Sequence, residues 1–410
     1  MSTRNWAKEY DLLSERLQSE GIDVAQVEQR LKNQKIETPS WGYADGGTRF
    51  GVFRQAGAPR NVREKIEDAA QAHRFTGIAP AVALHIPWDL VEDWAELANY
   101  ASGFGLSIGA INPNVFQDYE YRFGSLGSEV ASTRRRAIDH MVECVGIMNT
   151  VGSKALSLWF ADGTNFPGQG DFRRRKHHFE RGLAEVHAAL SPDQTMLLEY
   201  KPFEPAFYHT DIADWGMAYA FTKALGENAK VLVDLGHHLH GTNIEHIVAF
   251  LQDERRLGGF HFNNRKYADD DLTTGSINPY ELYLIFSELV AGEDAGVGDD
   301  IAYMIDESHT LKNKTAEMIQ SLTALQSAYA KALLINRKEL SLLQEADDLV
   351  GAEELVKAAF AVDVNPLLWK IRTDQGLPDP ANPIRGFVES GYIEAKANER
   401  GVGGGSGLGA

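Results

Sequence analysis

The stretch LGGFHFNNRKYADDD (Leu257–Asp271) joins a short apolar segment to a dense group of polar and acidic side chains. In its first half, Phe260 and Phe262 alternate with His261 and Asn263 after a pair of glycines, a pattern that is typical of a buried β-strand. Its second half ends in three consecutive aspartates. Parallel α/β folds bind their ligands where buried strands run into such polar residues.

The polar residues of this stretch also have a spacing that suits a metal ion. Side chains two residues apart in an extended chain share a face, so Asp269 and Asp271 can point together while Asp270 points away. With His261 they would form half of a coordination shell for a divalent cation. An acidic turn beside a hydrogen-bonded core histidine is the alternative, and the stretch alone leaves both interpretations open.

Composition limits the classes of protein to which the chain can belong. Its 410 residues, 43% hydrophobic and 24% charged, predict a globular protein with a large core, in two or three domains or as one barrel with additions. A net charge of −18 argues against a nucleic-acid partner. The single cysteine, Cys144, excludes an intrachain disulfide and a Cys-type zinc site. No stretch has the roughly 20 apolar residues of a membrane span, and no signal segment is evident, so we expect a cytoplasmic protein without a membrane partner.

Eight short apolar segments alternate with longer helical ones, which predicts parallel βαβ units and a (β/α)8 TIM barrel. The open doubly wound sheet is the rival, but no Gly-x-Gly-x-x-Gly follows the first strand. The predicted strands are Thr38–Tyr43, Ala81–Trp88, Leu106–Ile111, Ala155–Phe160, Met196–Tyr200, Val231–Leu235, Gly259–Asn263 and Tyr303–Ile305. The predicted helices between them are Val62–His73, Leu90–Gly103, Ser128–Val151, Asp171–Leu190, Asp211–Leu225, Asn243–Glu254 and Pro279–Ala291.

The flanking segments predict additions to the barrel. Residues 1–35 read as an N-terminal helical extension, and residues 36–330 as the barrel that carries the site. Residues 331–400 read as a C-terminal helical extension, interrupted by the helix-breaking run GLPDPANP. Residues 401–410 are rich in glycine and predict a disordered tail. The two helical extensions are candidate subunit contacts.

Four consecutive predicted strands end in a side chain that can bind a metal. These residues are Glu199, Asp234, His261 and Asp306, at intervals of 35, 27 and 45 residues that each suit one βα unit. Any one of them could be a core polar group or a helix cap. Four at equivalent positions instead predict a mixed carboxylate and imidazole shell at the barrel mouth.

A second group of ligands is predicted beside the first. His237 follows Asp234 by three residues and joins Asp269 and Asp271. Two carboxylates and one imidazole can hold a more open cation, and a catalytic metal needs an open position to reach substrate oxygens. The sequence therefore predicts two divalent cations for each chain.

Other residues near the strand ends suit a small polar substrate. Lys201 lies two residues beyond Glu199 and on the same side of the strand, where it could stabilise negative charge on a substrate oxygen or simply pair with a carboxylate. His85, Trp88 and Trp159 could form a wall against a sugar ring, or could pack in the interior.

Seven motifs resemble the L-rhamnose isomerases, specifically the broad-specificity bacterial type among the xylose-isomerase-like barrels. The similarity runs from about Ser40 to the helical tail. The motifs are SWGYADGGTRF (Ser40–Phe50), LHIPWD (Leu84–Asp89), SKALSLWFADGTNFPGQ (Ser153–Gln169), EYKPFEPAFY (Glu199–Tyr208), VDLGHH (Val233–His238), GGFHFNNRKYADDDL (Gly258–Leu272) and MIDESH (Met304–His309).

This resemblance implies an aldose–ketose isomerase that converts L-rhamnose to L-rhamnulose and also acts on sugars such as D-allose and D-psicose. It implies the same two metal groups, a sugar site that includes His85, Trp159 and Lys201, and a Mn²⁺-preferring homotetramer. Co²⁺, Mg²⁺ or Zn²⁺ would also suit the ligands. We expect a hydride shift in which Lys201, Asp306 and His237 serve as the catalytic residues, with an enediol route as the mechanistic alternative.

The sequence departs from the family pattern at three positions. Tyr200 stands where the family has His, and Asn264-Arg265 stands where it has Asp-Ser. None of the three is a predicted ligand, and Arg265 is expected to add positive charge near the barrel mouth.

Four other functions are alternatives. A metal-dependent phosphodiesterase is disfavoured by the charge of −18. A sugar epimerase is compatible with the ligands, whereas a sugar-phosphate isomerase is disfavoured because no glycine occurs between Asp306 and Gly351 to form a phosphate loop. A sugar-binding protein without activity would not need Lys201 or the second group of ligands.

Overall fold

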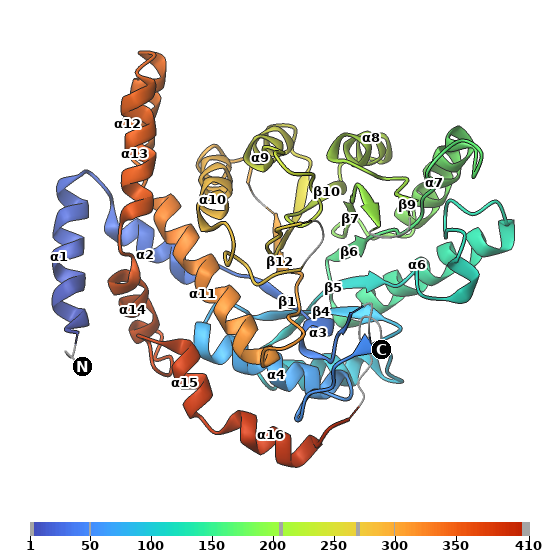
Figure 1. Ribbon diagram of the computed structural model, residues 1–410, viewed down its shortest axis with the longest axis horizontal. Coiled ribbons are helices and arrows are strands. Elements are labelled where there is room, and N and C mark those ends of the chain that lie inside the picture. The colour runs from blue at the N-terminus through green and yellow to red at the C-terminus, as the bar shows by residue number, and fades with distance from the viewer. Residues whose placement is uncertain (1–3, 49–50, 205–207, 268–270, 299, 404–410) are drawn as a thin grey trace.

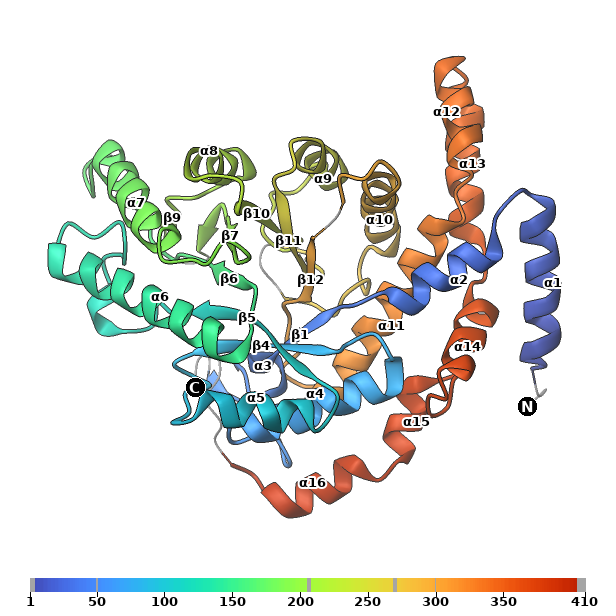
Figure 2. The same ribbon diagram turned by 180° about the vertical axis from the view of Figure 1, so that it is seen from behind.

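The computed structural model describes residues 4–48, 51–204, 208–267, 271–298 and 300–403. Its centre is a closed parallel barrel of eight strands in the order β1-β12-β11-β10-β7-β6-β5-β4, with helices packed around it (Figures 1 and 2). The predicted (β/α)8 fold is therefore confirmed. The barrel strands are β1 (Glu37–Pro39), β4 (Ala81–Ile86), β5 (Ser107–Pro113), β6 (Ala155–Leu158), β7 (Thr195–Glu199), β10 (Ala229–Asp234), β11 (Leu257–Phe262) and β12 (Ala302–Ile305).

Two short antiparallel pairs lie outside the barrel. The first pair is β2 (Gly47–Thr48) with β3 (Gly51–Val52), and the second is β8 (Phe203–Glu204) with β9 (Tyr208–His209). They belong to the segments that follow β1 and β7, at the end of the barrel where the strands finish. This end also carries the candidate site.

Each of the seven predicted helices is present, and most begin a few residues later than predicted. An example is the helix after β4, which starts at Trp94 because the Asp93 side chain accepts a hydrogen bond from Glu96 N at 2.9 Å and caps it. The observed helices are α4 (Val62–Thr76), α5 (Trp94–Ser102), α6 (Ala131–Val151), α7 (Phe172–His187), α8 (Trp215–Leu225), α9 (Ile244–Asp253) and α10 (Pro279–Asp294), with the short 3₁₀ helix η1 (Tyr119–Tyr121) before α6.

The predicted first strand, Thr38–Tyr43, is wrong in its second half. β1 ends at Pro39, and residues Ser40–Tyr43 form the single helical turn α3. The turn is buried, and the Tyr43 hydroxyl donates back to Thr38 Oγ1 at 3.0 Å. A run in which every side chain is buried has no periodicity that separates a strand from a helical turn, so the pattern misled the prediction.

Small and apolar side chains fill the barrel interior. They are Ala83, Ala110, Leu197, Leu232 and Met304, with one acidic residue, Glu37, among them. Gly109 makes room for this carboxylate, since a Cβ at that position would lie 1.6 Å from Glu37 Oε2. The carboxylate accepts a hydrogen bond from Ala110 N at 2.8 Å, and burial raises the pKa of Glu37 to about 7.

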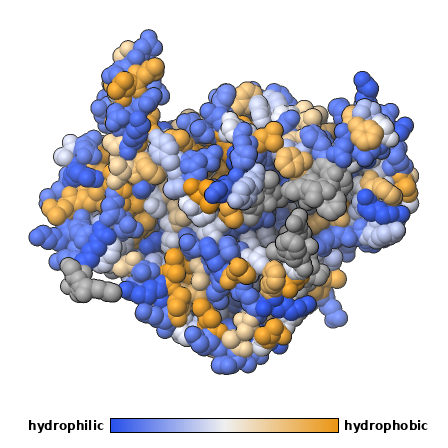
Figure 3. All heavy atoms as spheres, in the orientation of Figure 1, coloured by the Kyte–Doolittle hydropathy of each residue, from blue (hydrophilic) through white to orange (hydrophobic). Residues whose placement is uncertain are grey.

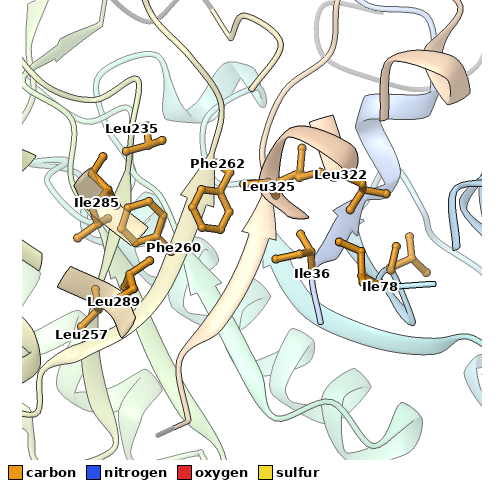
Figure 4. Packing of buried hydrophobic residues seen from close by; sticks show 14 of the residues in the cluster. Ile36, Ile78, Leu235, Leu257, Phe260, Phe262, Ile285, Leu289, Leu322 and Leu325 are labelled. Atoms are coloured by element: carbon orange, nitrogen blue, oxygen red, sulfur yellow. The ribbon is translucent and has the colours of Figure 1, made fainter. Parts of the chain in front are cut away.

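The main core lies between the barrel and its helices, and it explains where His261 points. Phe260 and Phe262 of β11 face outward toward Ile285 and Leu289 of α10 (Figure 4), and the Phe262 ring stacks on Phe286 with centroids 5.3 Å apart. Neighbouring side chains of a strand point to opposite faces. The residue between the two phenylalanines, His261, therefore points into the barrel.

The N-terminal and C-terminal helices wrap around one side of the barrel (Figure 1). They are α1 (Trp6–Ser19), α2 (Val24–Asn33), α11 (Lys314–Leu333), α12 (Arg337–Glu345), α13 (Leu349–Ala361), α14 (Asn365–Asp374), α15 (Pro383–Glu389) and α16 (Tyr392–Arg400). Near the C-terminus, the fully buried Arg400 side chain donates to both carboxylate oxygens of Asp68 in α4 at 3.0 Å. This ion pair fixes the last helix to the barrel.

The pair α12 and α13 projects from the body as a hairpin (Figure 1), and apolar residues are exposed on its surface (Figure 3). These are Leu342, Leu349 and Val350, which are 58%, 68% and 74% exposed. Across the described residues, every helix is too short or too polar to span a bilayer.

Candidate metal centre

Four predicted ligands meet at the carboxyl ends of adjacent barrel strands. They come from β7, β10, β11 and the residue after β12, and one ligand atom from each lies within 4.8 Å of all the others. The four residues are Glu199, Asp234, His261 and Asp306. The structure thus brings the first predicted group together.

The environment of His261 suits a metal ligand. Its Nδ1 atom is buried and makes no hydrogen bond within the described structure, yet it lies 3.4 Å from Glu199 Oε1, 3.6 Å from Asp234 Oδ2 and 3.7 Å from Asp306 Oδ2. Ligands bonded to one cation at about 2.1 Å are about 3.0–3.5 Å apart, close to these separations. The residues therefore fit a divalent cation.

The charges of the group favour a cation as well. Burial works against a charged imidazole, but the carboxylates of Glu199 and Asp306 outweigh it and raise the pKa of His261 well above its usual range. Burial, helped by the neighbouring carboxylates, raises the pKa of Asp306 to about 6. Two buried carboxylates and the partly buried one of Asp306 need compensating positive charge, which a divalent cation would supply in place of the histidine proton.

Hydrogen bonds from a second layer orient two of the carboxylates. Asn263 Nδ2 donates to Asp234 Oδ1 at 3.0 Å and to the carbonyl of Asp306 at 3.1 Å. Gly236 N donates to Asp234 Oδ1 at 2.6 Å, and Trp41 Nε1 donates to Asp306 Oδ1 at 2.6 Å. Such outer partners hold ligands in position for a metal. Asn263 and Trp41 were not among the predicted site residues.

The second predicted group is only partly described. His237 Nδ1 donates to the carbonyl of Tyr200 at 3.0 Å and lies 3.1 Å from Glu199 Oε1, which leaves Nε2 as the ligand atom. Asp271 lines the same cavity and has a left-handed backbone, with φ 43°. Asp269, together with Asp270, lies outside the described residues. His237 and Asp271 therefore share a cavity with the first group.

This cavity has a volume of about 520 Å³, and its two sides differ in chemistry. One side carries the ligands together with Lys201, which is buried. The other side is formed by aromatic and amide side chains. They are Trp41, His85, Trp88, Asn112, Asn114, Phe116, Gln117, Tyr121 and Trp159.

The structure places His85, Trp88 and Trp159, the three residues of the predicted wall, on the cavity lining, where Phe116 joins their rings into one row. Phe116 lies between Trp159 and Trp88, with ring centroids 4.7 Å and 6.2 Å away, and Trp88 stacks on His85 at 5.7 Å. Trp159 Nε1 is buried without a hydrogen-bond partner in the described structure. Lys201 Nζ lies 5.0 Å from the centre of the Trp159 ring, where the aromatic side meets the charged side.

Sequence reasoning missed the contribution of the loop between β5 and α6. Phe116, Gln117, Tyr121 and Arg122 from this loop line the cavity. Another residue, Asp162, fixes the loop: its carboxylate accepts hydrogen bonds at 2.7 Å from the backbone N and hydroxyl of Ser125 and from Gly127 N. Asp162 is a polar residue shortly after β6, and this position in the sequence is the signal that could have pointed to a role near the site.

The residues that depart from the family pattern lie behind the ligands. The guanidinium of Arg265 donates to the carbonyls of Leu235, His238 and Leu239 at 3.0–3.4 Å, which places its positive charge beside the segment that carries His237. Tyr200 and His238 are joined by a buried hydrogen bond of 2.6 Å between the hydroxyl and Nε2. Arg265 thus braces the segment that contains His237.

Known proteins are similar to this chain in sequence. Residues 67–307 match the model of a family described as xylose isomerase-like TIM barrel. A probable sugar isomerase of Rhizobium meliloti (strain 1021) is 44% identical over 98% of this chain and 95% of its own length. A second probable sugar isomerase, from Mesorhizobium japonicum, is 44% identical over 98% of this chain and 94% of its own length.

The similarity to solved structures supports the fold. An L-ribulose 3-epimerase superposes with a TM-score of 0.52 over 76% of this chain and 98% of that chain, at 12% identity. At this identity the likeness concerns the arrangement of the barrel and not the chemistry of the site.

Proposed function

The chain belongs to the xylose isomerase-like TIM-barrel family, and we propose that it is a metal-dependent aldose–ketose isomerase that converts L-rhamnose to L-rhamnulose. Related sugars such as D-allose and D-psicose are proposed as further substrates. One observation carries the proposal: a four-ligand cluster opens into a cavity of about 520 Å³ whose opposite wall is aromatic and amide-rich. This combination suits a polyol that is held by its C–H face while its oxygens reach a cation.

We propose two divalent cations for each chain, with Mn²⁺ as the preferred ion. Glu199, Asp234, His261 and Asp306 would hold the first, and His237 with Asp269 and Asp271 would hold the second. When bound, such cations act as Lewis acids that polarise the oxygens on C1 and C2 of the open-chain sugar.

In the proposed reaction, hydride moves from C2 of the aldose to C1, the proton of the C2 hydroxyl is lost, and the oxygen on C1 gains a proton. Lys201 Nζ, on the cavity wall beside the ligands, donates a hydrogen bond to the oxygen on which negative charge develops. Asp306, whose side chain is 25% exposed and held by Trp41, takes the proton from one oxygen and returns it to the other. His237 would serve by holding the second cation, which would supply an open position for a substrate oxygen.

The first test is ketose formation from L-rhamnose by protein stripped with EDTA, before and after addition of Mn²⁺. Activity should appear with Mn²⁺ and be lost in Asp271→Asn, while Asp253→Asn, at an exposed position on α9, should behave as the unchanged protein. Activity that ignores metal would contradict the proposal. Conversion of a ketose to its epimer, with no aldose formed, would establish the epimerase alternative instead.

A second test separates the two chemical routes. The reaction is run in D₂O, and deuterium on C1 of the product is measured by mass spectrometry. Its absence is expected, because a hydride that moves directly between carbons does not exchange with solvent. Substantial incorporation would show the enediol route.

We also propose a homotetramer. The exposed apolar side chains on the α12–α13 hairpin support an assembly, since an exposed apolar patch marks a contact surface. Light scattering coupled to size-exclusion chromatography would give the mass, and a monomer at micromolar concentration would refute the assembly without affecting the proposed reaction.

A further inference from the structure

His85 lies near the end of β4 and lines the cavity at the barrel mouth. Behind it is a buried series of hydrogen-bonded polar side chains. The Lys65 ammonium of α4 pairs with Asp89 Oδ1 at 2.7 Å, and both side chains are completely buried. Ser40, the first residue of α3, contacts both Asp89 and His85. Three separate elements therefore meet at one histidine of the cavity.

Both oxygens of Asp89 serve as acceptors. Oδ1 accepts from Lys65, and Oδ2 accepts from the backbone N of His85 at 2.8 Å and from the hydroxyl of Ser40. A carboxyl group that receives donors on both oxygens, one of them a buried ammonium, is ionised. Asp89 cannot give a hydrogen to Ser40.

The position of the hydrogen on the His85 imidazole follows from these donor and acceptor assignments. A serine hydroxyl has a single hydrogen, and Ser40 uses it on Asp89. Ser40 Oγ lies 3.2 Å from His85 Nδ1, so at this contact the oxygen can only accept. The hydrogen must therefore be on Nδ1 of His85. In a neutral ring, Nε2 then carries a lone pair.

Two further features keep the ring neutral. The charge of Asp89 is already balanced by Lys65 and is separated from the imidazole by a hydroxyl, so it offers little stabilisation to an imidazolium. Burial lowers the pKa of His85 to about 3.

We propose that Lys65, Asp89 and Ser40 fix His85 as the tautomer with its hydrogen on Nδ1, so that Nε2 accepts a hydrogen bond from a hydroxyl group of the substrate. His85 lines the cavity beside Trp88, opposite the cluster of ligands. Ser40, Asp89 and Lys65 are positioning residues in this arrangement. Only the identity of the hydroxyl, as that of a sugar, rests on the proposed function.

The tautomer is measurable without any substrate. The full chain, labelled with ¹⁵N in its 13 histidines, is studied by solid-state NMR after EDTA treatment, and the resonances lost in His85→Gln identify this ring. We expect a protonated Nδ1 and an unprotonated Nε2. A hydrogen on Nε2, or on both nitrogens, at pH 7.5 would overturn the proposal.

Ser40→Ala tests the cause of the tautomer. Without its acceptor at Nδ1, the ring should gain the form with hydrogen on Nε2. Ser125→Ala is the matched control, because Ser125 is equally buried and its hydroxyl donates to Asp162 at 2.7 Å in another part of the structure. The His85 resonances should not change in this control. An unchanged tautomer in Ser40→Ala would refute the role of Ser40.

Kinetics then connect the tautomer to function. Ser40→Ala should lower kcat/KM for L-rhamnose by roughly 10²-fold while Mn²⁺ affinity stays unchanged, because a hydrogen in the wrong place removes the acceptor. An unchanged kcat/KM would refute the role of Nε2. The expected NMR result in a protein that turns over no sugar would leave the tautomer established and would refute the proposed function instead.

Discussion

The two sides of the cavity belong to the same barrel but carry different types of side chain. The side formed by β7, β10, β11 and β12 supplies carboxylates and imidazoles, whereas the side formed by β4, β5, β6 and α3 with their loops supplies indoles, amides, one neutral histidine and the guanidinium of Arg122. In the strand order, β7, β10, β11 and β12 are adjacent on the first side, and β6, β5, β4 and β1, the strand that precedes α3, are adjacent on the second. The charged side is suited to a cation and the aromatic side to the body of a sugar.

The two sides also differ in how they are held. Glu199, Asp234 and His261 stand on the barrel strands themselves. Hydrogen bonds from Asn263 to Asp234 and from Trp41 to Asp306 orient these two carboxylates. Much of the aromatic side comes from the loop after β5, which is fixed through Asp162. Strands position side chains more accurately than loops do. The candidate ligands therefore stand on the barrel strands, whereas much of the aromatic side depends on how one loop is held by Asp162.

Asp234→Asn should have the largest effect, because it breaks the charged side alone. Asp234 is 1% exposed and cannot be replaced by solvent as a ligand. A metal contributes several kcal/mol to stabilising the transition state, so activity should fall by more than about 10³-fold. The Mn²⁺-dependent rise in Tm should become smaller too, because only the second site is left to bind Mn²⁺. Scanning calorimetry with and without Mn²⁺ measures this rise; a rise as large in the variant as in the unchanged protein would contradict the assignment of the first site.

Most of the fold on both sides could be predicted from the sequence. The alternation of short apolar and longer helical segments located eight strands and seven helices, because βαβ units repeat one pattern. The exception was Ser40–Tyr43, where burial on all sides hides the periodicity. Helix starts moved by a few residues because an N-cap side chain such as Asp93, rather than the apolar pattern, sets the first turn.

The site was predictable where residues follow strands. Glu199, Asp234, His261 and Asp306 were found in this way, since equivalent strand ends meet at one edge of a barrel. No comparable rule predicts contacts between segments that are distant in the sequence. The pairing of Lys65 with Asp89 and the cavity-facing residues of the loop after β5 depend on how helices and loops pack, which no local spacing encodes.

Arg265→Met should weaken the charged side without removing a ligand. Three carbonyls of the segment around His237 lose their donor, so the segment should move and the ion held by His237 should bind about 10- to 100-fold more weakly. Isothermal titration with Mn²⁺ measures each ion. Arg256→Met is the matched control, since Arg256 donates to the carbonyl of Ala229 at 3.1 Å, at the start of β10 and thus at the opposite end of the barrel. Equal effects of both variants would refute a local role for Arg265.

His238 and His261 share the charged side but have opposite pKa shifts. Carboxylates raise the pKa of His261, whereas burial lowers the pKa of His238 to about 3. Unfolded His238 takes up a proton near pH 6.5 and folded His238 does not, so stability is lost as pH falls from about 6.5 toward 3. One such group accounts for about 2 kcal/mol of the loss of unfolding free energy between pH 6.5 and 4.5.

His238→Gln should remove this part of the pH dependence. Urea unfolding in EDTA at pH 4.5, 5.5 and 6.5 gives the unfolding free energies, and the curve of the variant should be flatter than that of the unchanged protein by this amount. His246→Gln, at an exposed position on α9, is the control and should keep the original slope. Parallel curves for all three proteins would show that His238 is charged in the folded state.

Trp159→Phe should have the smallest effect and should act on the aromatic side alone. The variant keeps an aromatic face but loses Nε1, a buried donor without a hydrogen-bond partner in the described structure, which a sugar hydroxyl could satisfy. One neutral hydrogen bond is worth about 0.5–1.5 kcal/mol, so KM should rise by roughly 2- to 10-fold with kcat and Mn²⁺ affinity unchanged. Trp215→Phe, on α8 against Phe250 and away from the cavity, should leave KM unaltered. Weaker Mn²⁺ binding in Trp159→Phe would contradict the division between a cation side and a sugar side. The two sides would then be coupled through Lys201, whose ammonium lies 5.0 Å from the centre of the Trp159 ring.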